Sequence, residues 1–403
     1  MTHTLEGRRN SAGVESADVT RWPLVLLCCL PLIVLRAWIL FRPLQFYDFI
    51  TYWSAGHQFL TGGHPYSQTV TVTAEQLHST AVAQPQIMLS PPWTLPFVAV
   101  MALLPFRAAQ MGWLVISLLL NCFSSLGLWI YFGGEKRRAW IAILISLTFI
   151  PMGGAEFMSQ ITPLMLACLT AFLLLLRSER YFMAGVLLLG VGFKPHLLYL
   201  ALLAGLFWVI EKHAWAVFAG AFAGYGTATI ATLLYNPHSL EYFHHTYRFA
   251  IEVPCGVGWV LRSIFGVQYS WLQFLPSFFG LAWFLYYWVK HRRQWDWQIH
   301  LPLLLVVSIG TSPYFWYHDF ILILPALIAL AVRGAYRSSS VPAAYLGVQG
   351  LVVLAATLSP AWMCAASLLW IPFYVFADAV TMRKPAETIE IEANAGIYAQ
   401  TTN

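Results

Sequence analysis

Long apolar runs separated by short polar stretches dominate this chain. Several runs are shorter than the roughly 20 residues that a straight membrane-spanning helix needs. Either the helices extend further than the runs, or their ends are broken helices that line a cavity. The pattern predicts an all-α integral membrane protein of about twelve transmembrane helices. The expected spans are 22-41, 109-132, 139-152, 160-176, 181-193, 196-210, 214-235, 270-289, 299-311, 320-332, 342-359 and 361-377.

The longest polar interruption is the first loop, 42-108. Its stretch FYDFITYWSAGHQFL predicts an amphipathic helix that ends at Gly62-Gly63, a strong helix-stop signal. The apolar segment 92-106 either spans the membrane or lies at its surface as an interfacial or re-entrant piece. If it spans, the cluster GGEKRRA at 133-139 moves outside, against the positive-inside rule. We therefore expect 92-106 not to span.

Basic clusters then all fall on one side of the membrane, which indicates that both termini are cytoplasmic. The first apolar run has no small-residue cleavage site after it, so we interpret it as a signal anchor and first span. The expected organisation is a polar tail at 1-21, a transmembrane domain at 22-380 and a second polar tail at 381-403, in the plasma (inner) membrane. The clusters are EKRR (135-138), RSER (177-180), EKH (211-213), KHRR (290-293), RGAYR (333-337) and MRK (382-384).

Composition excludes an ordinary soluble domain. The chain is 59% hydrophobic and 10% charged, whereas a soluble domain carries about 25% charged residues. The net charge of +5 sits in short loops, without a basic stripe that would bind nucleic acid. Of the six cysteines, all but Cys255 lie in apolar runs, so the sequence predicts neither a disulfide framework nor a CxxC pair.

Unusual ionisable residues gather on the side away from the basic loops, and Asp48 comes first among them. Asp48 and Tyr52 are four residues apart, so they share a helix face. Partial desolvation would raise the pKa of Asp48 into the range of a general base. The alternative is that Asp48 only stabilises the helix N-terminus.

Two further polar positions follow between apolar runs. Glu156 and Gln160 are also four apart and could face a cavity, although Glu156 could equally be a solvated turn residue. Lys194 stands beside a proline on the side where positive charge is otherwise sparse. An anionic phosphate would explain that lysine; snorkelling to lipid headgroups is the alternative.

The remaining candidates lie in two outer loops. His318 as imidazolium could pair with a phosphate, with Asp319 orienting it or binding a sugar hydroxyl; an interfacial turn is the alternative. Arg248 is a second candidate phosphate contact, or a solvated loop residue. His244 and His245 are neighbours that point in different directions on a helix, so we expect no shared metal.

Five segments have a familiar order and cover roughly residues 20-335. They are YDFITYWSAGHQFLTGGHPYS, SPPWTLPFVAVMALLPF, EFMSQITPLMLACLTAFLLL, GVGFKPHLLYLALL and TSPYFWYHDFILILPALIAL. In these segments the chain resembles glycosyltransferase family 87. The resemblance implies a GT-C-type helical bundle with interfacial helices in the first extracytoplasmic loop. It also implies transfer of a hexose, typically mannose, from a polyprenyl-phosphate donor to a glycolipid or glycan acceptor, by an inverting displacement on the extracytoplasmic face without a metal or other cofactor.

The resemblance also suggests roles for particular residues. Two positions depart from the family pattern: Met158-Ser159-Gln160 replaces a common Gly-Gln pair, and His196 stands where glutamine is common after Lys-Pro. The implied roles are Asp48 as catalytic base; Lys194, His318 and Arg248 as contacts of the donor phosphate; and Tyr52, Glu156, Gln160, His196 and Asp319 as contacts of the sugar or acceptor.

Two other function classes remain open from the sequence. A transporter or flippase for a lipid-linked sugar would use the same cations to bind phosphate but would need no base. A polymerase or ligase for surface polysaccharide would share the lipid donor, although the long loop usual in such proteins is not obvious here.

Overall fold

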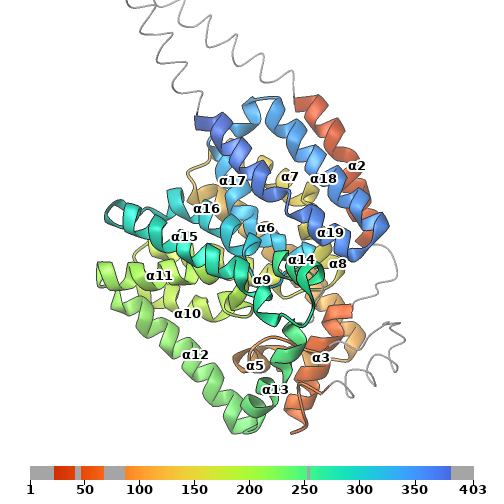
Figure 1. The fold of residues 1–403 in the computed structure, drawn as a ribbon, viewed down its shortest axis with the longest axis vertical. Coiled ribbons are helices and arrows are strands. Elements are labelled where there is room, and N and C mark those ends of the chain that lie inside the picture. Colours follow the sequence, from red (N-terminus) through yellow and green to blue (C-terminus); the bar gives the residue numbers. More distant parts are fainter. Residues whose placement is uncertain (1–21, 41–46, 68–86, 252–254, 383–403) are drawn as a thin grey trace, which may run out of the picture.

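The computed structural model describes residues 22–40, 47–67, 87–251 and 255–382. Within these ranges the chain is helical and contains no strand, which confirms the all-α prediction. The expected tail at 1-21, and all but the first residues of the tail at 381-403, lie outside the described residues. The α-helices are α2 (Trp22–Leu40), α3 (Tyr47–Leu60), α5 (Leu95–Ala102), α6 (Phe106–Tyr131), α7 (Trp140–Thr148), α8 (Ile150–Phe157), α9 (Thr162–Arg177), α10 (Tyr181–Val191), α11 (Tyr199–Lys212), α12 (Trp215–Tyr235), α13 (Ser239–Ile251), α14 (Val257–Phe265), α15 (Leu275–His291), α16 (Trp297–Gly310), α17 (Leu324–Val332), α18 (Ser340–Leu358) and α19 (Pro360–Ser367) (Figure 1).

Some of these helices are long and apolar enough to cross a membrane. Among the described residues there are four, and up to five if α7 and α8, which meet at a 60° bend, form one broken span. The four are α6, α12, α18 and the helix Pro360–Met382, of which α19 is the first part. Shorter apolar helices account for other expected spans, so the count of about twelve stays a prediction.

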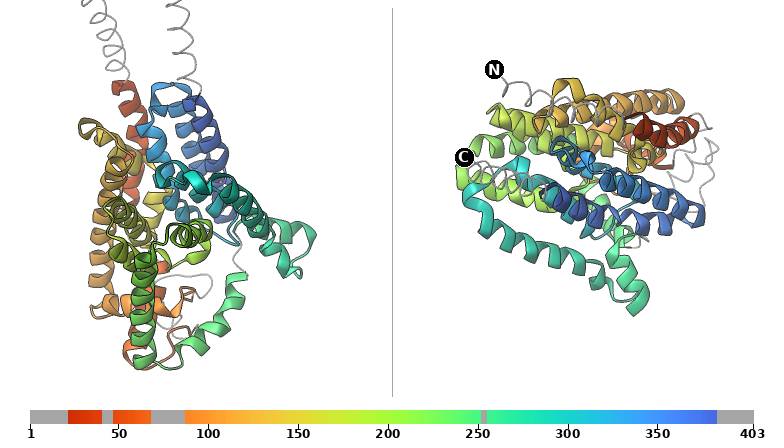
Figure 2. Two further views of the ribbon diagram at one scale, coloured as in Figure 1. Left: turned by 90° about the vertical axis from the view of Figure 1, so that its left-hand side faces the viewer. Right: turned by 90° about the horizontal axis from the view of Figure 1, so that it is seen from above.

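Four of the basic clusters contact one another in two pairs. Arg138 of EKRR donates to Tyr336 Oη of RGAYR at 2.8 Å, and Arg292 of KHRR lies 3.7 Å from Glu211 of EKH. The start of α2 and the end of the C-terminal helix lie at the upper end of the molecule in Figures 1 and 2, while α3, α5 and α13 lie at the lower end. The placement of all six basic clusters on one side of the membrane stays a prediction.

The first loop packs two short helices together at the opposite end. α3 stops where predicted: Gly62 has φ +73°, and Gly63 N–H donates to Gln58 O at 2.8 Å. A Cβ at Gly56 would lie 2.3 Å from Val98 O, so glycine permits the close approach of α3 and α5. With eight residues, α5 is about 12 Å long, too short to cross a bilayer core of about 30 Å. This length is consistent with a non-spanning 92-106.

A buried ion pair joins α2 to α8. Arg36 Nε donates to Glu156 Oε2 at 2.9 Å, and Arg36 Nη2 donates to Glu156 Oε1. Asn121 of α6 donates to the same Oε1 at 2.7 Å. Glu156 is fully buried inside α8, so its interpretation as a solvated turn residue is wrong. Three helices are thus held by one carboxylate.

The turn after α8 carries an unusual backbone conformation. Ser159 has φ +48°, a left-handed conformation that costs a non-glycine residue about 1–2 kcal/mol. Gln160 N–H donates to Ala155 O at 2.8 Å, which closes the turn before α9 begins at Thr162. A glycine, as in the Gly-Gln pair of the family pattern, would fit this position without strain.

α17 is the most enclosed helix. Every residue from Leu324 to Ala331 is buried, as expected for a helix that is apolar all round. The 3-10 segment η6 (Tyr317–Ile323) leads directly into α17, so this core helix fixes the position of the polar residues that precede it.

Removing one partner of the Arg36–Glu156 pair should destabilise the protein strongly. Glu156→Leu leaves a buried guanidinium without its counter-charge, a loss of about 3–5 kcal/mol. Arg36→Met should do the same, whereas the double variant should unfold at a higher temperature than either single variant. The thermal-unfolding midpoint of the purified protein measures this, with Glu241→Gln on exposed α13 as control. If the destabilisation of the double variant equalled the sum of the two single-variant destabilisations, the pairing of Arg36 with Glu156 would be contradicted.

Two substitutions of Ser159 should separate the effect of the backbone conformation on stability from the effect of the side chain. Ser159→Ala keeps the unfavourable φ and loses the hydroxyl, whereas Ser159→Gly removes both the hydroxyl and the strain. We expect the glycine variant to be more stable than the alanine variant by about 1 kcal/mol. Chemical unfolding of the two variants side by side tests this, and an alanine variant equal to the glycine variant would refute a strained turn.

Candidate active site

Four polar side chains from distant parts of the chain meet in one group. Asp48 comes from the first turn of α3, Gln160 from the turn between α8 and α9, Lys194 from the residue before η3 (Pro195–Leu197), and Asp319 from η6. Hydrogen bonds join them in the order Asp48, Gln160, Lys194, Asp319. We call this set the Asp48–Asp319 chain of polar groups.

Gln160 is the junction of this chain. Its Nε2 donates to Asp48 Oδ2, and its Oε1 accepts from Tyr52 Oη and from Lys194 Nζ, each at 3.0 Å. Asp48 and Tyr52 therefore share a helix face, as their spacing predicts. Trp113 Nε1 donates to the Gln160 backbone carbonyl at 3.1 Å and so holds the backbone of this residue in place.

Lys194 lies between two acceptors. Its Nζ is 2.9 Å from Asp319 Oδ1, and the lysine side chain is only 14% exposed. Asp319 is 1% exposed and its Oδ2 accepts from the Trp316 backbone N–H at 2.9 Å. The lysine does not snorkel; it uses two of the three donors of an ammonium group and keeps one for a ligand.

Asp48 has the electrostatics of a base. Burial raises the pKa of Asp48 to about 6, while the Lys194 ammonium and the hydrogen bond from Gln160 act in the opposite direction. Its Oδ1 makes no hydrogen bond with any residue in the described ranges. At neutral pH this carboxylate is ionised, yet it is a better proton acceptor than an exposed aspartate.

A hollow of about 150 Å³ lies beside Lys194. Phe193, Phe243 and Tyr314 form apolar walls, and His196 lies against Tyr314 with ring centroids 4.1 Å apart. The Nε2 atom of His196 is buried and has no hydrogen-bond partner in the part of the chain that the structure describes. Aromatic walls with a few polar atoms are typical of a small-molecule site.

His318 borders the same group. It is 1% exposed, its Nε2 lies 3.9 Å from Asp319 Oδ1, and neither ring nitrogen has a hydrogen-bond partner among the described residues. Burial without a hydrogen bond disfavours the charged imidazolium. The predicted phosphate contact by a protonated His318 therefore stays a prediction.

The structure does not bring every predicted site residue into this group. Glu156 is occupied by Arg36 and Asn121, as described above. Arg248 falls in α13, but its side chain lies outside the described residues. His244 and His245 are exposed on α13, and within the described ranges no three His, Cys, Asp or Glu residues come together as a metal site would require.

Sequence reasoning missed several residues around the site. Arg36 carried a usable signal, because an arginine inside an apolar span needs a buried partner. Asn121 and Trp113 carried none, since polar or aromatic residues are common in membrane helices, and neither did Tyr314, which is one of several aromatic residues in the stretch between α16 and η6. Their contacts depend on how distant helices pack.

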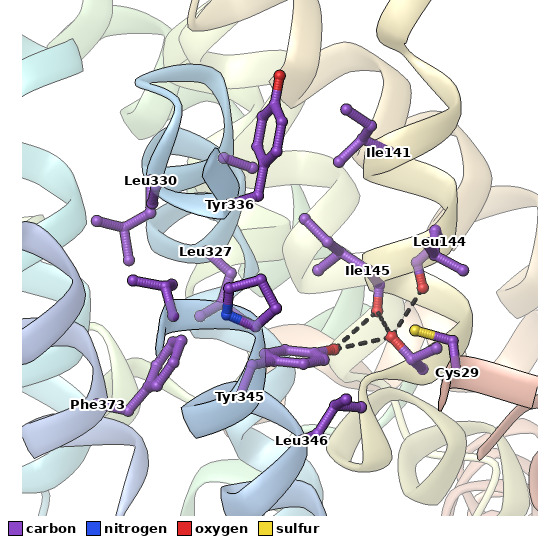
Figure 3. A pocket seen from close by; sticks show the side chains of 15 residues that line it. Cys29, Ile141, Leu144, Ile145, Leu327, Leu330, Tyr336, Tyr345, Leu346 and Phe373 are labelled. Carbon is purple, nitrogen blue, oxygen red and sulfur yellow. Dashed lines mark hydrogen bonds between the residues drawn. The ribbon is translucent and has the colours of Figure 1, made fainter. Parts of the chain in front are cut away.

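A second hollow, of about 100 Å³, lies on another side of the bundle (Figure 3). Side chains of α2, α7, α17 and α18 line it, and Tyr345 Oη there pairs with Thr148 Oγ1 at 3.0 Å. Its lining is almost entirely apolar and contains no charged residue. It therefore lacks the charged groups that would hold a phosphate.

Comparison with known proteins adds a family. The model of glycosyltransferase family 87 matches residues 89–360, more than half of the chain. The matched region contains Gln160, Lys194 and Asp319, and it begins after Asp48. No curated protein and no solved structure matches the chain. The chain belongs to glycosyltransferase family 87.

Proposed function

We propose that this glycosyltransferase moves a hexose, most simply mannose, from a polyprenyl-phosphate donor to a hydroxyl group of a glycolipid or glycan. In this proposal the reaction takes place on the extracytoplasmic face of the plasma membrane. The observation that carries it is the pairing of a raised-pKa carboxylate, Asp48, with a buried ammonium group, Lys194, through one glutamine.

Asp48 acts as the base. Its free Oδ1 takes the proton of the acceptor hydroxyl as the hydroxyl oxygen attacks the anomeric carbon of the donor sugar. The bond from that carbon to the phosphate oxygen breaks in the same step, so the configuration inverts. One carboxylate suffices, because a phosphate leaves without needing a protonating acid.

Lys194 supports the leaving phosphate. A phosphate in the neighbouring hollow can take the remaining N–H of the ammonium group, while Asp319 holds the lysine in place. Charge that develops on the phosphate oxygen is then stabilised where water is scarce. Arg248 is a further candidate for this contact, as is the ring N–H of a neutral His318, and in this proposal no divalent metal takes part.

Membrane placement favours a lipid-linked donor. The Asp48–Asp319 chain of polar groups lies where the amphipathic first loop meets the apolar bundle. A prenyl tail could therefore stay in the bilayer while its phosphate reaches Lys194. The basic loops contact one another in pairs, Arg138 with Tyr336 and Arg292 with Glu211. By the positive-inside rule, the reacting groups would then face away from the cytoplasm.

Replacing the base should abolish transfer without removing donor binding. Asp48→Asn should lower the rate by at least about 10²-fold, measured as transfer of labelled mannose from synthetic polyprenyl-phosphate-mannose to total lipid and cell-envelope extracts with EDTA present. Asp296→Asn, at an exposed helix N-cap near the basic loops, is the matched control. If Asp48→Asn transferred mannose as fast as the wild type, Asp48 would not be the base. If the protein moved the donor across the membrane without transferring the sugar, a flippase would be favoured.

The rate should also depend on pH through Asp48. The base must be ionised, and its pKa is about 6, so the rate should be constant above that pH. Below it the rate should fall about tenfold per pH unit. A pH–rate profile between about pH 4 and pH 8, about two units on either side of the pKa, tests this, and a flat profile would contradict it.

Removing the Lys194 charge should act mainly on the chemical step. Lys194→Gln should lower kcat by roughly 10²-fold, since the cation is needed most as charge develops on the leaving phosphate. Lys194→Arg should keep part of the rate. Lys290→Gln, on an exposed helix end near the basic loops, is the control, and a variant impaired only in KM would assign Lys194 to ground-state binding.

A further inference from the structure

Two cysteines far apart in the sequence meet beside the candidate active site. The Sγ atoms of Cys255 and Cys364 lie 2.7 Å apart, although 109 residues separate them. Each residue is 2% exposed. The sulfurs of a disulfide are about 2.0 Å apart, so a small movement of the side chains would bring them to bonding distance.

The backbone around the pair is closely packed. Cys255 precedes Gly256, which has φ +103°, and a Cβ at Gly256 would lie 3.3 Å from Tyr314 Cα. Cys364 occupies the buried face of α19. Leu89, Tyr314, Trp316 and Tyr317 pack against the two cysteines. The pair therefore lies under the aromatic stretch that leads to His318 and Asp319.

The location decides the redox environment. The pair lies beside the Asp48–Asp319 chain of polar groups, and the proposed function, on which this inference rests, places that chain on the extracytoplasmic side. Disulfides form and persist outside the cytoplasm. The sequence predicted no disulfide because Cys364 lies in an apolar run, but the structure places Cys364 against Cys255 at the start of α14.

We propose that Cys255 and Cys364 are joined by a disulfide in the mature protein. The two thiols lose two protons and two electrons, and the sulfur–sulfur bond forms between them. The electrons and protons pass to the disulfide of an extracytoplasmic thiol–disulfide carrier, which leaves as a dithiol. The product ties the loop before α14 to α19.

The disulfide would hold part of the active site. Trp316 packs on the cysteine pair, and its backbone N–H binds Asp319 Oδ2 at 2.9 Å. Asp319 in turn holds Lys194. Cross-linking the two sides of this aromatic stretch would therefore limit the positions that the phosphate-binding lysine can take.

The two cysteine thiols are expected to react slowly in the folded protein. The hydrogen bond with Cys364 and burial raise the pKa of the Cys255 thiol, and a buried thiol with a raised pKa reacts slowly. Native labelling would therefore give few adducts whether or not the bond exists. Thiols must be blocked and counted in denaturant, after acid quenching of the cells.

The experiment uses the full chain in membranes from aerobically grown cells. Free thiols are blocked with N-ethylmaleimide in SDS, the sample is reduced, and new thiols are labelled with polyethylene-glycol maleimide. We expect two added labels on the wild type and on Cys122→Ser, a control at an exposed cysteine of α6, and none on Cys255→Ser or Cys364→Ser.

A second test of the disulfide needs only the wild-type protein. A non-reducing digest should yield one cross-linked peptide pair that contains Cys255 and Cys364 and separates on reduction. No added label on the wild type, or two labels that persist in Cys255→Ser, would overturn the proposal. Neither readout needs transferase activity, so failure of the proposed reaction and failure of the disulfide are distinguishable.

Discussion

The ion pair between Arg36 and Glu156 sets the position of everything that follows it. Two opposite charges that are both buried in an apolar bundle can be kept only together, because either one alone would lose its hydration without compensation. The pair fixes α8 against α2 and α6. The turn after α8 then places Gln160 between α3, η3 and η6.

The candidate site depends on this packing rather than on any local motif. Each of its charged groups is held by a residue from another part of the chain: Asp48 by Gln160, and Lys194 by Asp319. Such a chain of contacts orders the site before a substrate binds. Preorganisation of this kind is what a transferase needs to stabilise charge that appears only in the transition state.

Local sequence rules predicted the local features well. The spacing of Asp48 and Tyr52 placed both on one helix face, and Gly62-Gly63 ended that helix. An isolated lysine between apolar runs also drew attention to Lys194. The two helix predictions are confirmed because each depends only on helix geometry within a few residues, whereas the role of Lys194 stays a prediction.

Predictions that required knowledge of a partner were incomplete. Glu156 was assigned to sugar or acceptor binding, yet its carboxylate belongs to Arg36, which is 120 residues away. Cys364 appeared to be an isolated apolar residue until the structure placed it beside Cys255. The departure at Ser159 could be noticed in the sequence, but its left-handed backbone could not, because a turn of this kind is set by the helices on both sides.

Gln160 gives the site a direction. An amide has one end that donates and one that accepts, and here the donating end meets a carboxylate while the accepting end meets an ammonium group. Turned around, the side chain would set oxygen against oxygen and N–H against N–H. In the observed orientation one neutral side chain therefore matches a negative group on one side and a positive group on the other, and so holds opposite charges apart within a single set of hydrogen bonds.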